Sequence, residues 1–134
     1  AGKNLKPKLR IVGVQAAGAP AVYESWRSGR LQQMDRADTF AEGLATRVAF
    51  SLPAQILWRR LDDFRLVTDQ EMRRSILTLL ETTRTLAEGA GAAALAAAHN
   101  MREELAGKKV GIVVSGGNIT LDALAETLAM EQPW

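Results

Sequence analysis

The 134-residue sequence contains no cysteine, which excludes disulfide bonds, thiolate catalysis and metal sites built from cysteine. It contains one histidine, His99, and a single histidine cannot build a zinc site unaided. Aromatic residues make up only 5% of the chain, so stacking platforms for single-stranded nucleic acid are not expected. The net charge is only +2, with basic residues scattered among nearly as many acids, which argues against a nucleic-acid partner.

The sequence also lacks any apolar run close to the ~20 residues that a membrane-spanning helix needs, and no signal peptide opens it. We therefore expect no membrane association and a cytoplasmic location. The composition, with 47% hydrophobic and 24% charged residues, is that of an ordinary globular protein, and the length fits one domain with a real core.

Three stretches have the composition of β-strands. Leu9–Gln15 is β-branched and follows Pro7, which discourages a helix. Phe64–Thr68 is short and follows a pair of aspartates. Lys109–Ser115 is almost entirely apolar, as expected for a central parallel strand that is covered on both faces.

Helical patterns separate these stretches. The segment after Thr68 begins with a capping box formed with Glu71, and the last helix has Asn118 as its expected cap. A long alanine-rich helix must pack very tightly against a neighbour. The remaining expected helices and the alanine-rich one span Ala19–Ser28, Asp38–Val48, Pro53–Leu61 and Ala90–Ala106.

Strands that alternate with helices predict a parallel α/β sheet with right-handed crossovers. Three parallel strands alone would leave two unpaired edges, which is a liability in an isolated domain. We therefore expect residues 1–134 to form a single, incomplete α/β domain, with the rest of the sheet supplied by other parts of a longer polypeptide.

The strongest candidate site is Ser115-Gly116-Gly117-Asn118, at the carboxyl end of the third expected strand. Ligands of open α/β sheets bind at such ends, and glycines there allow close approach to the main chain. The same spacing also fits a tight turn between a strand and a helix, in which Ser115 only caps. Both interpretations stay open on the spacing alone.

Other stretches carry weaker signals. Glu88-Gly89-Ala90-Gly91 could place a carboxylate beside bare amides, although helix capping is the simpler explanation. Phe40–Thr46 contains Gly43 and the hydroxyl of Thr46, and on its own it is typical of a helix with a packing glycine. Gly13–Pro20 is another turn after a strand, without a carboxylate for a hard cation. His99 is expected to be a surface residue, not a general base.

Five motifs in this order resemble one family: RIVGVQAAGAP, DTFAEGLAT, FRLVTDQEM, LAEGAGAAALAA and VVSGGNITLD. From about Leu5 to Leu128 the chain resembles the C-terminal part of the catalytic domain of threonine dehydratases (threonine ammonia-lyases) and their serine racemase relatives. These are pyridoxal-phosphate enzymes of fold type II. The resemblance implies a parallel three-layer α/β sandwich that is part of their larger domain.

The resemblance also implies roles for individual residues. Ser115 is expected to hydrogen-bond the pyridine nitrogen of pyridoxal 5'-phosphate, with Gly116 forming part of the close turn beside it. The backbone of Gly43 is expected to pass near the ring substituents, and Glu88 to lie near cofactor and substrate. Thr46 falls where some relatives have a serine near the substrate.

Two departures from the family are visible. Some relatives bind a divalent cation through a glutamate and an aspartate at the positions of Gln15 and Ala21, so no metal site is expected here. The family motif E-P-x-A-G is shortened to EGAG at Glu88.

The family's Schiff-base lysine, substrate loop and phosphate cradle would all lie upstream of this chain. Lys108 and Lys109 precede their strand, so six residues at ~3.3 Å each would hold them about 20 Å from Ser115. We therefore expect no catalytic residue in these 134 residues and no activity or cofactor binding from them alone.

For the parent protein, the resemblance implies dehydration and deamination of threonine or serine to a 2-oxo acid and ammonia, and a homo-oligomer. A serine hydroxyl is a neutral partner and cannot keep a ring nitrogen protonated as a carboxylate can. We hypothesise that this makes the ring a milder electron sink, suited to rapid loss of a β-hydroxyl. The alternatives are a serine racemase-type isomerase and a non-catalytic, Rossmann-like binding or interaction module.

Overall fold

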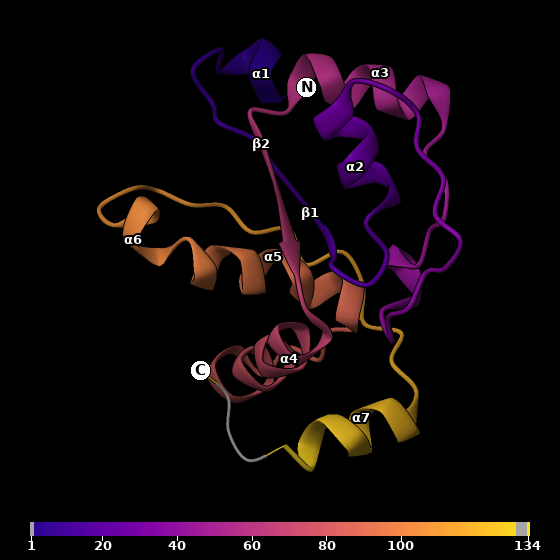
Figure 1. The fold of residues 1–134 in the computed structure, drawn as a ribbon. Helices are drawn as coiled ribbons and strands as arrows, with labels where there is room; N and C mark the ends of the chain where they lie inside the picture. The colour runs from indigo at the N-terminus through magenta and orange to yellow at the C-terminus, as the bar shows by residue number, and fades with distance from the viewer. Residues whose placement is uncertain (1, 131–133) are drawn as a thin grey trace.

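A computed structural model describes residues 2–130 and 134, and its elements are shown in Figure 1. Two β-strands and eight helical segments follow one another in the described part of the chain. Their bounds are α1 Gly2–Leu5, β1 Val12–Ala16, α2 Ala21–Ser28, the 3-10 helix η1 Glu42–Leu44, α3 Ser51–Arg60, β2 Asp63–Val67, α4 Asp69–Thr83, α5 Gly89–Asn100, α6 Arg102–Leu105 and α7 Leu121–Leu128.

The two strands form a parallel pair, with Val12 opposite Asp63 and Ala16 opposite Val67. The α2 and α3 crossover between them gives the parallel α/β arrangement that the alternating pattern predicts. The expected fold class is therefore confirmed. The observed strands are shifted by one to three residues at their starts relative to Leu9–Gln15 and Phe64–Thr68.

The third expected strand is not a strand in the described part of the chain. Residues 109–115 have no regular secondary structure, and the side chains of Val110, Ile112, Val113 and Val114 are exposed. A β-strand exists only through hydrogen bonds to a neighbouring strand, and no described segment provides one here. The expected count of about three strands is therefore wrong for this chain, which has a two-stranded sheet over residues 2–130.

One face of the strand pair packs against α2, which α3 supports from the side (Figure 1). The buried ring of Phe64 meets Tyr23 edge-on, with centroids 5.7 Å apart, and lies 5.8 Å from the ring of Trp26. Trp58 of α3 donates its Nε1 hydrogen to the carbonyl of Ser25 at 3.1 Å. Gly29 ends α2 in the left-handed conformation that glycine adopts without strain.

The alanine-rich helix α5 contacts both strands and packs along α4 (Figure 1). Its small side chains allow this close approach, because they add little bulk between the two helix axes. The resulting core consists of small residues with a few larger ones from α4 and β2, and its main members are Ala16, Ala19, Ala41, Val67, Met72, Ala93, Ala96 and Ala97. The tight packing expected of the alanine-rich helix is confirmed.

The capping box at the start of α4 is confirmed. The amide of Glu71 donates to Thr68 Oγ1 at 3.2 Å, and the amide of Thr68 donates to Glu71 Oε2 at 2.6 Å. Two main-chain donors that have no partner within the helix are satisfied in this way.

Three helix predictions need correction. Asp38–Val48 is not a helix but a loop with the short η1, because the amides of Asp38 and Phe40 bond to Gly18 and Asp69, outside the segment. The helix expected over Ala90–Ala106 is interrupted at Met101 and continues as α6. The cap of α7 is Thr120, whose Oγ1 accepts from the amide of Ala123 at 3.2 Å, and not Asn118. Within residues 2–130 no helix combines the length and hydrophobicity needed to cross a bilayer.

Candidate functional site

The turn after the third apolar stretch lies against the start of α5. The amide of Glu88 donates a hydrogen bond to the carbonyl of Gly116 at 3.1 Å. Residues that are 28 positions apart are thereby held together, although the stretch before Gly116 has no partner strand among the described residues. The structure therefore brings two of the predicted cofactor-binding residues, Glu88 and Gly116, into direct contact.

Glycines lie on both sides of this contact, and two of them, Gly91 and Gly117, face main-chain atoms. A Cβ atom on Gly91 would collide with the main chain of Gly116, and one on Gly116 would collide with the carboxylate of Glu88. At Gly117 an added Cβ would lie 2.7 Å from the carbonyl oxygen of Leu86. The SGG and EGAG motifs are thus two halves of one close main-chain packing arrangement, which a single motif could not reveal.

Gly43 approaches the same region of α5. A Cβ on Gly43 would lie 2.9 Å from the Cβ of Ala90, so the backbone of η1 runs close to the first turn of α5. The first turn of α5 therefore lies close to both Gly43 and Gly116. Three predicted cofactor-binding positions, Gly43, Glu88 and Gly116, surround it.

Ser115 is exposed, and its hydroxyl forms no hydrogen bond with any residue that the structure describes. It precedes Gly116 and is therefore next to the contact with Glu88. The alternative in which Ser115 only caps a helix does not fit, because Thr120 caps α7. The hydroxyl is available to an external acceptor.

The other substrate-side candidate, Thr46, uses its hydroxyl locally. Its Oγ1 donates to the carbonyl of Val48 at 2.8 Å, in a segment where Val48 forms an isolated antiparallel bridge with Gln33. The side chain is half-buried. A substrate carboxylate would have to compete with Val48 for the Thr46 hydrogen, whereas the hydroxyl oxygen can still accept from a substrate donor.

The two positions that replace metal ligands in some relatives have structural partners here. The buried side chain of Gln15 accepts a hydrogen bond from the amide of Tyr23 at 2.9 Å, and Ala21 is fully buried at the start of α2. Gln15 Oε1 thus serves the first turn of α2, where main-chain amides lack helical partners. His99, the one histidine, is half-buried and stacks on the ring of Trp134 with centroids 3.7 Å apart.

Charged groups gather where the two strands begin. The hydrogen bond from Lys3 and that from the amide of Ile11 hold the pKa of the Asp62 carboxyl below its usual value. Burial works to raise the pKa of Asp63, but hydrogen bonds from Arg65 and the amide of Phe64 lower it overall. These groups stand where the strands begin, away from the Ser115 turn.

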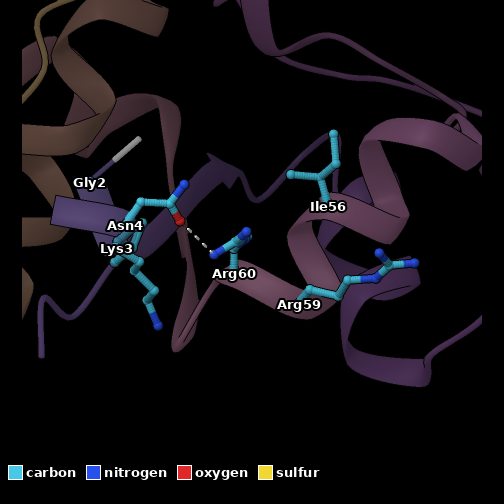
Figure 2. A pocket seen from close by; sticks show the side chains of 7 residues that line it. Gly2, Lys3, Asn4, Ile56, Arg59 and Arg60 are labelled. Atoms are coloured by element: carbon cyan, nitrogen blue, oxygen red, sulfur yellow. Dashed lines mark hydrogen bonds between the residues drawn. The ribbon is translucent and has the colours of Figure 1, made fainter. Parts of the chain in front are cut away.

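A surface cavity of about 480 Å³ lies at this same end of the strands. Figure 2 shows it between α1 and α3, where Arg60 donates to Asn4 Oδ1 at 3.2 Å. Its lining residues are Gly2, Lys3, Asn4, Ile11, Ile56, Arg59 and Arg60. None of the predicted site residues contributes to it, so this cavity is separate from the candidate site.

Sequence reasoning missed two residues of α4 that hold the Gly43 segment, Asp69 and Arg73. The carboxylate of Asp69 accepts from Thr39 Oγ1 at 2.5 Å and from the amide of Phe40 at 3.0 Å. The guanidinium of Arg73 lies 4.2 Å from the ring centroid of Phe40. An acid in the first turn of a capped helix is ordinary, so no local signal distinguished Asp69.

Residues 1–116 match the family described as "Pyridoxal-phosphate dependent enzyme", which is well over half of the chain. The chain belongs to this family. Its members carry out their chemistry with bound pyridoxal phosphate, which agrees with the cofactor expected from the five motifs.

Three individual proteins are similar to this chain. The chain is 35% identical to an L-threonine ammonia-lyase of Thermotoga maritima over 122 residues, which is 91% of this chain and 30% of that protein. The processed form of threonine deaminase isoform 2 from Solanum lycopersicum is similar in structure, with a TM-score of 0.85 and 27% identity over 93% of this chain and 37% of that one. Maize serine racemase gives a TM-score of 0.84 and 27% identity over 96% of this chain and 42% of that one.

The chain thus spans about 30% of the length of the curated relative and about two fifths of the solved structures that it matches. The similarity to threonine deaminase and serine racemase confirms the resemblance and the fold type expected from the sequence.

The residues around Gly116 fit the ring of the cofactor. Ser115 offers a neutral hydroxyl donor, which suits an unprotonated pyridine nitrogen, and it is open to an external acceptor. The absence of side chains at Gly43 and Gly116 lets two backbone segments pack directly against the first turn of α5, and Gly116 directly follows this hydroxyl.

Proposed function

We propose that this chain is the ring-binding part of the catalytic domain of a pyridoxal-phosphate-dependent ammonia-lyase acting on threonine or serine. The observation that carries this is the contact between Glu88 and Gly116, which places the free hydroxyl of Ser115 beside the glycine-rich start of α5. The similarity to threonine ammonia-lyase and threonine deaminase supports the reaction class.

In this proposal each residue has a separate task. Bound pyridoxal phosphate supplies an electron sink for the bond that breaks at the substrate Cα. Ser115 donates a hydrogen bond to the ring nitrogen. The nitrogen stays unprotonated, because a hydroxyl is too weak an acid to transfer its proton at neutral pH. Glu88 offers a carboxylate near the ring, and Gly43 and Gly116 bring their backbone segments against the first turn of α5 beside it.

The net reaction converts a β-hydroxy amino acid to a 2-oxo acid and ammonia. The amino acid loses its α-proton and its β-hydroxyl as water, and one water is taken up again when the released enamine hydrolyses. The neutral partner at Ser115 favours this elimination over transamination, because a ring nitrogen without its proton delocalises less charge from Cα.

We further propose that the rest of the catalytic domain lies in other segments of a longer polypeptide, which supply the cofactor's lysine and phosphate-binding loop. The exposed, unpaired stretch Val110–Val114 supports this, since its apolar side chains would be covered by a neighbouring strand and helix layer in a complete sheet. Lys108 and Lys109 come before that stretch, so they stand at its far end from Ser115. We place the complete enzyme in the cytoplasm as a homo-oligomer.

The test is the full-length gene product with threonine and serine as substrates. We expect a visible absorption band of lysine-bound pyridoxal phosphate and formation of the 2-oxo acid and ammonia in equal amounts. The isolated 134-residue chain should give neither, and Ser115→Ala in the full-length protein should lower the rate of elimination. A full-length protein that binds no pyridoxal phosphate would refute the proposal.

A second candidate, racemisation of serine, is favoured by the structural similarity to maize serine racemase. The same full-length protein, incubated with L-serine, would then release D-serine faster than pyruvate. We expect pyruvate to exceed D-serine, because the neutral ring partner does not prolong the carbanion that racemisation needs.

A further inference from the structure

Two residues of α4, Asp69 and Arg73, lie one helical turn apart and both contact the segment Thr39–Gly43. Asp69 accepts hydrogen bonds from Thr39 Oγ1 and the amide of Phe40, and Arg73 lies over the ring of Phe40. Positions i and i+4 share one face of a helix, so α4 presents both groups to the same loop.

The Asp69 carboxylate supplies hydrogen-bond acceptors at the start of this loop. Thr39 Oγ1 donates to Asp69 and at the same time accepts from the amide of Ala41 at 3.2 Å. One carboxylate therefore accounts, directly or through one hydroxyl, for the amides of Phe40 and Ala41. Buried main-chain amides need such partners, and Ala41 is only 2% exposed.

The segment Thr39–Gly43 leads directly to the candidate site. A Cβ on Gly89 would lie 2.8 Å from the ring of Phe40, and Ala41 belongs to the core cluster that includes Ala93 and Ala96 of α5. Two residues further on, the backbone of Gly43 meets Ala90. The position of Gly43 relative to the first turn of α5 is thus fixed through Phe40 and Ala41.

We propose that Asp69 is a positioning residue for pyridoxal phosphate: by holding Thr39 and Phe40 it fixes the distance between Gly43 and the first turn of α5, where the ring binds. This inference rests on the proposed function, because it assigns Asp69 to the cofactor site without any contact to the cofactor. Asp69 contacts Thr39 and Phe40, Phe40 packs against Gly89, and Gly43 follows three residues further along the chain.

The experiment uses the full-length protein with Asp69→Asn, Thr39→Val and Thr39→Ser, and with Asp122→Asn as the matched control. Asp122 is also an acid in the first turn of a helix, but it is exposed on α7. Each protein is stripped of cofactor and titrated with pyridoxal phosphate, and the visible band gives the apparent dissociation constant. The thermal midpoint of the stripped protein is measured in parallel.

Asp69→Asn keeps one acceptor where two are needed, so we expect the dissociation constant for pyridoxal phosphate to rise about tenfold or more. Thr39→Val should give a similar loss, a double variant that combines Asp69→Asn with Thr39→Val should be no worse than either single one, and Thr39→Ser should keep the wild-type value. Asp122→Asn should also keep it.

An unchanged dissociation constant in Asp69→Asn or Thr39→Val, with only a lower thermal midpoint, would overturn the inference and reduce Asp69 to a structural role. If Asp69→Asn does not fold, the Thr39→Val and Thr39→Ser pair decides the question alone. The proposed function fails separately, since in that case the wild-type protein itself would show no cofactor band.

Discussion

The carbonyl oxygen of Gly116 accepts the hydrogen bond of the Glu88 amide, and this one bond joins the two motifs that hold the candidate site together. Gly116 follows an exposed extended stretch, whereas Glu88 begins the best-packed helix of the chain, α5. The turn that carries Ser115 is therefore positioned by its contact with α5 and does not depend on pairing within a sheet among the described residues.

Gly91→Ala is expected to destabilise the protein, because the new methyl group would meet the main chain of Gly116, which cannot rotate away. Overpacking of this kind costs about 1–3 kcal/mol, from which the better helix propensity of alanine subtracts up to about 1 kcal/mol. Urea unfolding measures the difference. Gly111→Ala, where nothing lies within 4 Å, is the control and should change stability by less than about 0.5 kcal/mol.

Glu71 gives the stability a defined dependence on pH. Burial works to raise the pKa of its carboxyl, but hydrogen bonds from the amide of Thr68 and the side chain of Asn100 outweigh it and hold the pKa below its ordinary value of 4.5. A lowered pKa in the folded state stabilises the protein above pH 4.5, and this stability is lost as the pH falls through the folded-state pKa.

Glu71→Gln should therefore lower the free energy of unfolding by about 1 kcal/mol at pH 7, and the difference from the wild type should shrink below pH 4.5. Unfolding curves between pH 7 and pH 3 test this. Glu81→Gln, at an exposed position of the same helix, should run parallel to the wild type throughout. A Glu71→Gln deficit that stayed constant down to pH 3 would contradict the assignment.

Arg73 links α4 to α7 as well as to Phe40. Its guanidinium donates to the carbonyl of Ala123 at 3.2 Å and to Thr127 Oγ1 at 2.9 Å, and it pairs with Glu126 at 2.8 Å. Arg73→Lys keeps the charge but loses the planar fork, so we expect a loss of about 1–3 kcal/mol in urea unfolding.

The control for this substitution is Arg74→Lys, because the Arg74 guanidinium lies 5.3 Å from the ring centroid of Trp134 and donates no comparable set of hydrogen bonds to the described residues. It should cost less than about 1 kcal/mol. Equal losses in the two variants would show that the fork of Arg73 does not hold α7.

The apolar stretch Val110–Val114 predicts association of the isolated 134-residue chain. Its main chain is unpaired and its apolar side chains are exposed, so it can pair readily with a second copy. Light scattering should show a mass that rises with concentration. Val113→Lys, at a side chain that is 77% exposed, should reduce this rise. Leu52→Lys, at a 71% exposed position of α3, is the matched control and should leave it unchanged. A clean monomer at all concentrations would contradict the prediction.

Those parts of the fold that depend on interactions between residues close in the sequence could be predicted from the sequence. The Thr68–Glu71 box, the end of α2 at Gly29 and the tight packing of the alanine-rich helix follow from propensity, capping and side-chain size. The loop around Gly43 could not be predicted as a loop, because two amides at its start bond to distant groups, Asp38 to the carbonyl of Gly18 and Phe40 to the carboxylate of Asp69. Tertiary hydrogen bonds outweighed a sequence pattern that favoured a helix.

The strand predicted over Lys109–Ser115 was wrong for a different reason. Its apolar composition indicates a buried strand, but burial and pairing both require neighbours that the described residues do not provide. For the site, the motifs named Ser115, Gly116, Glu88 and Gly43, and the structure brought the last three around one helical turn. No motif indicated that Asp69 supports them.

The most direct test of the role of Ser115 is nitrogen-15 NMR of the full-length protein loaded with pyridoxal phosphate labelled at the ring nitrogen, in the wild type and in Ser115→Asp. We predict the resonance of an unprotonated ring nitrogen in the wild type, its change to that of a protonated nitrogen in Ser115→Asp, and a matching decrease in the ratio of elimination to transamination. Identical resonances and ratios in the two proteins would contradict the claim that this hydroxyl faces the ring.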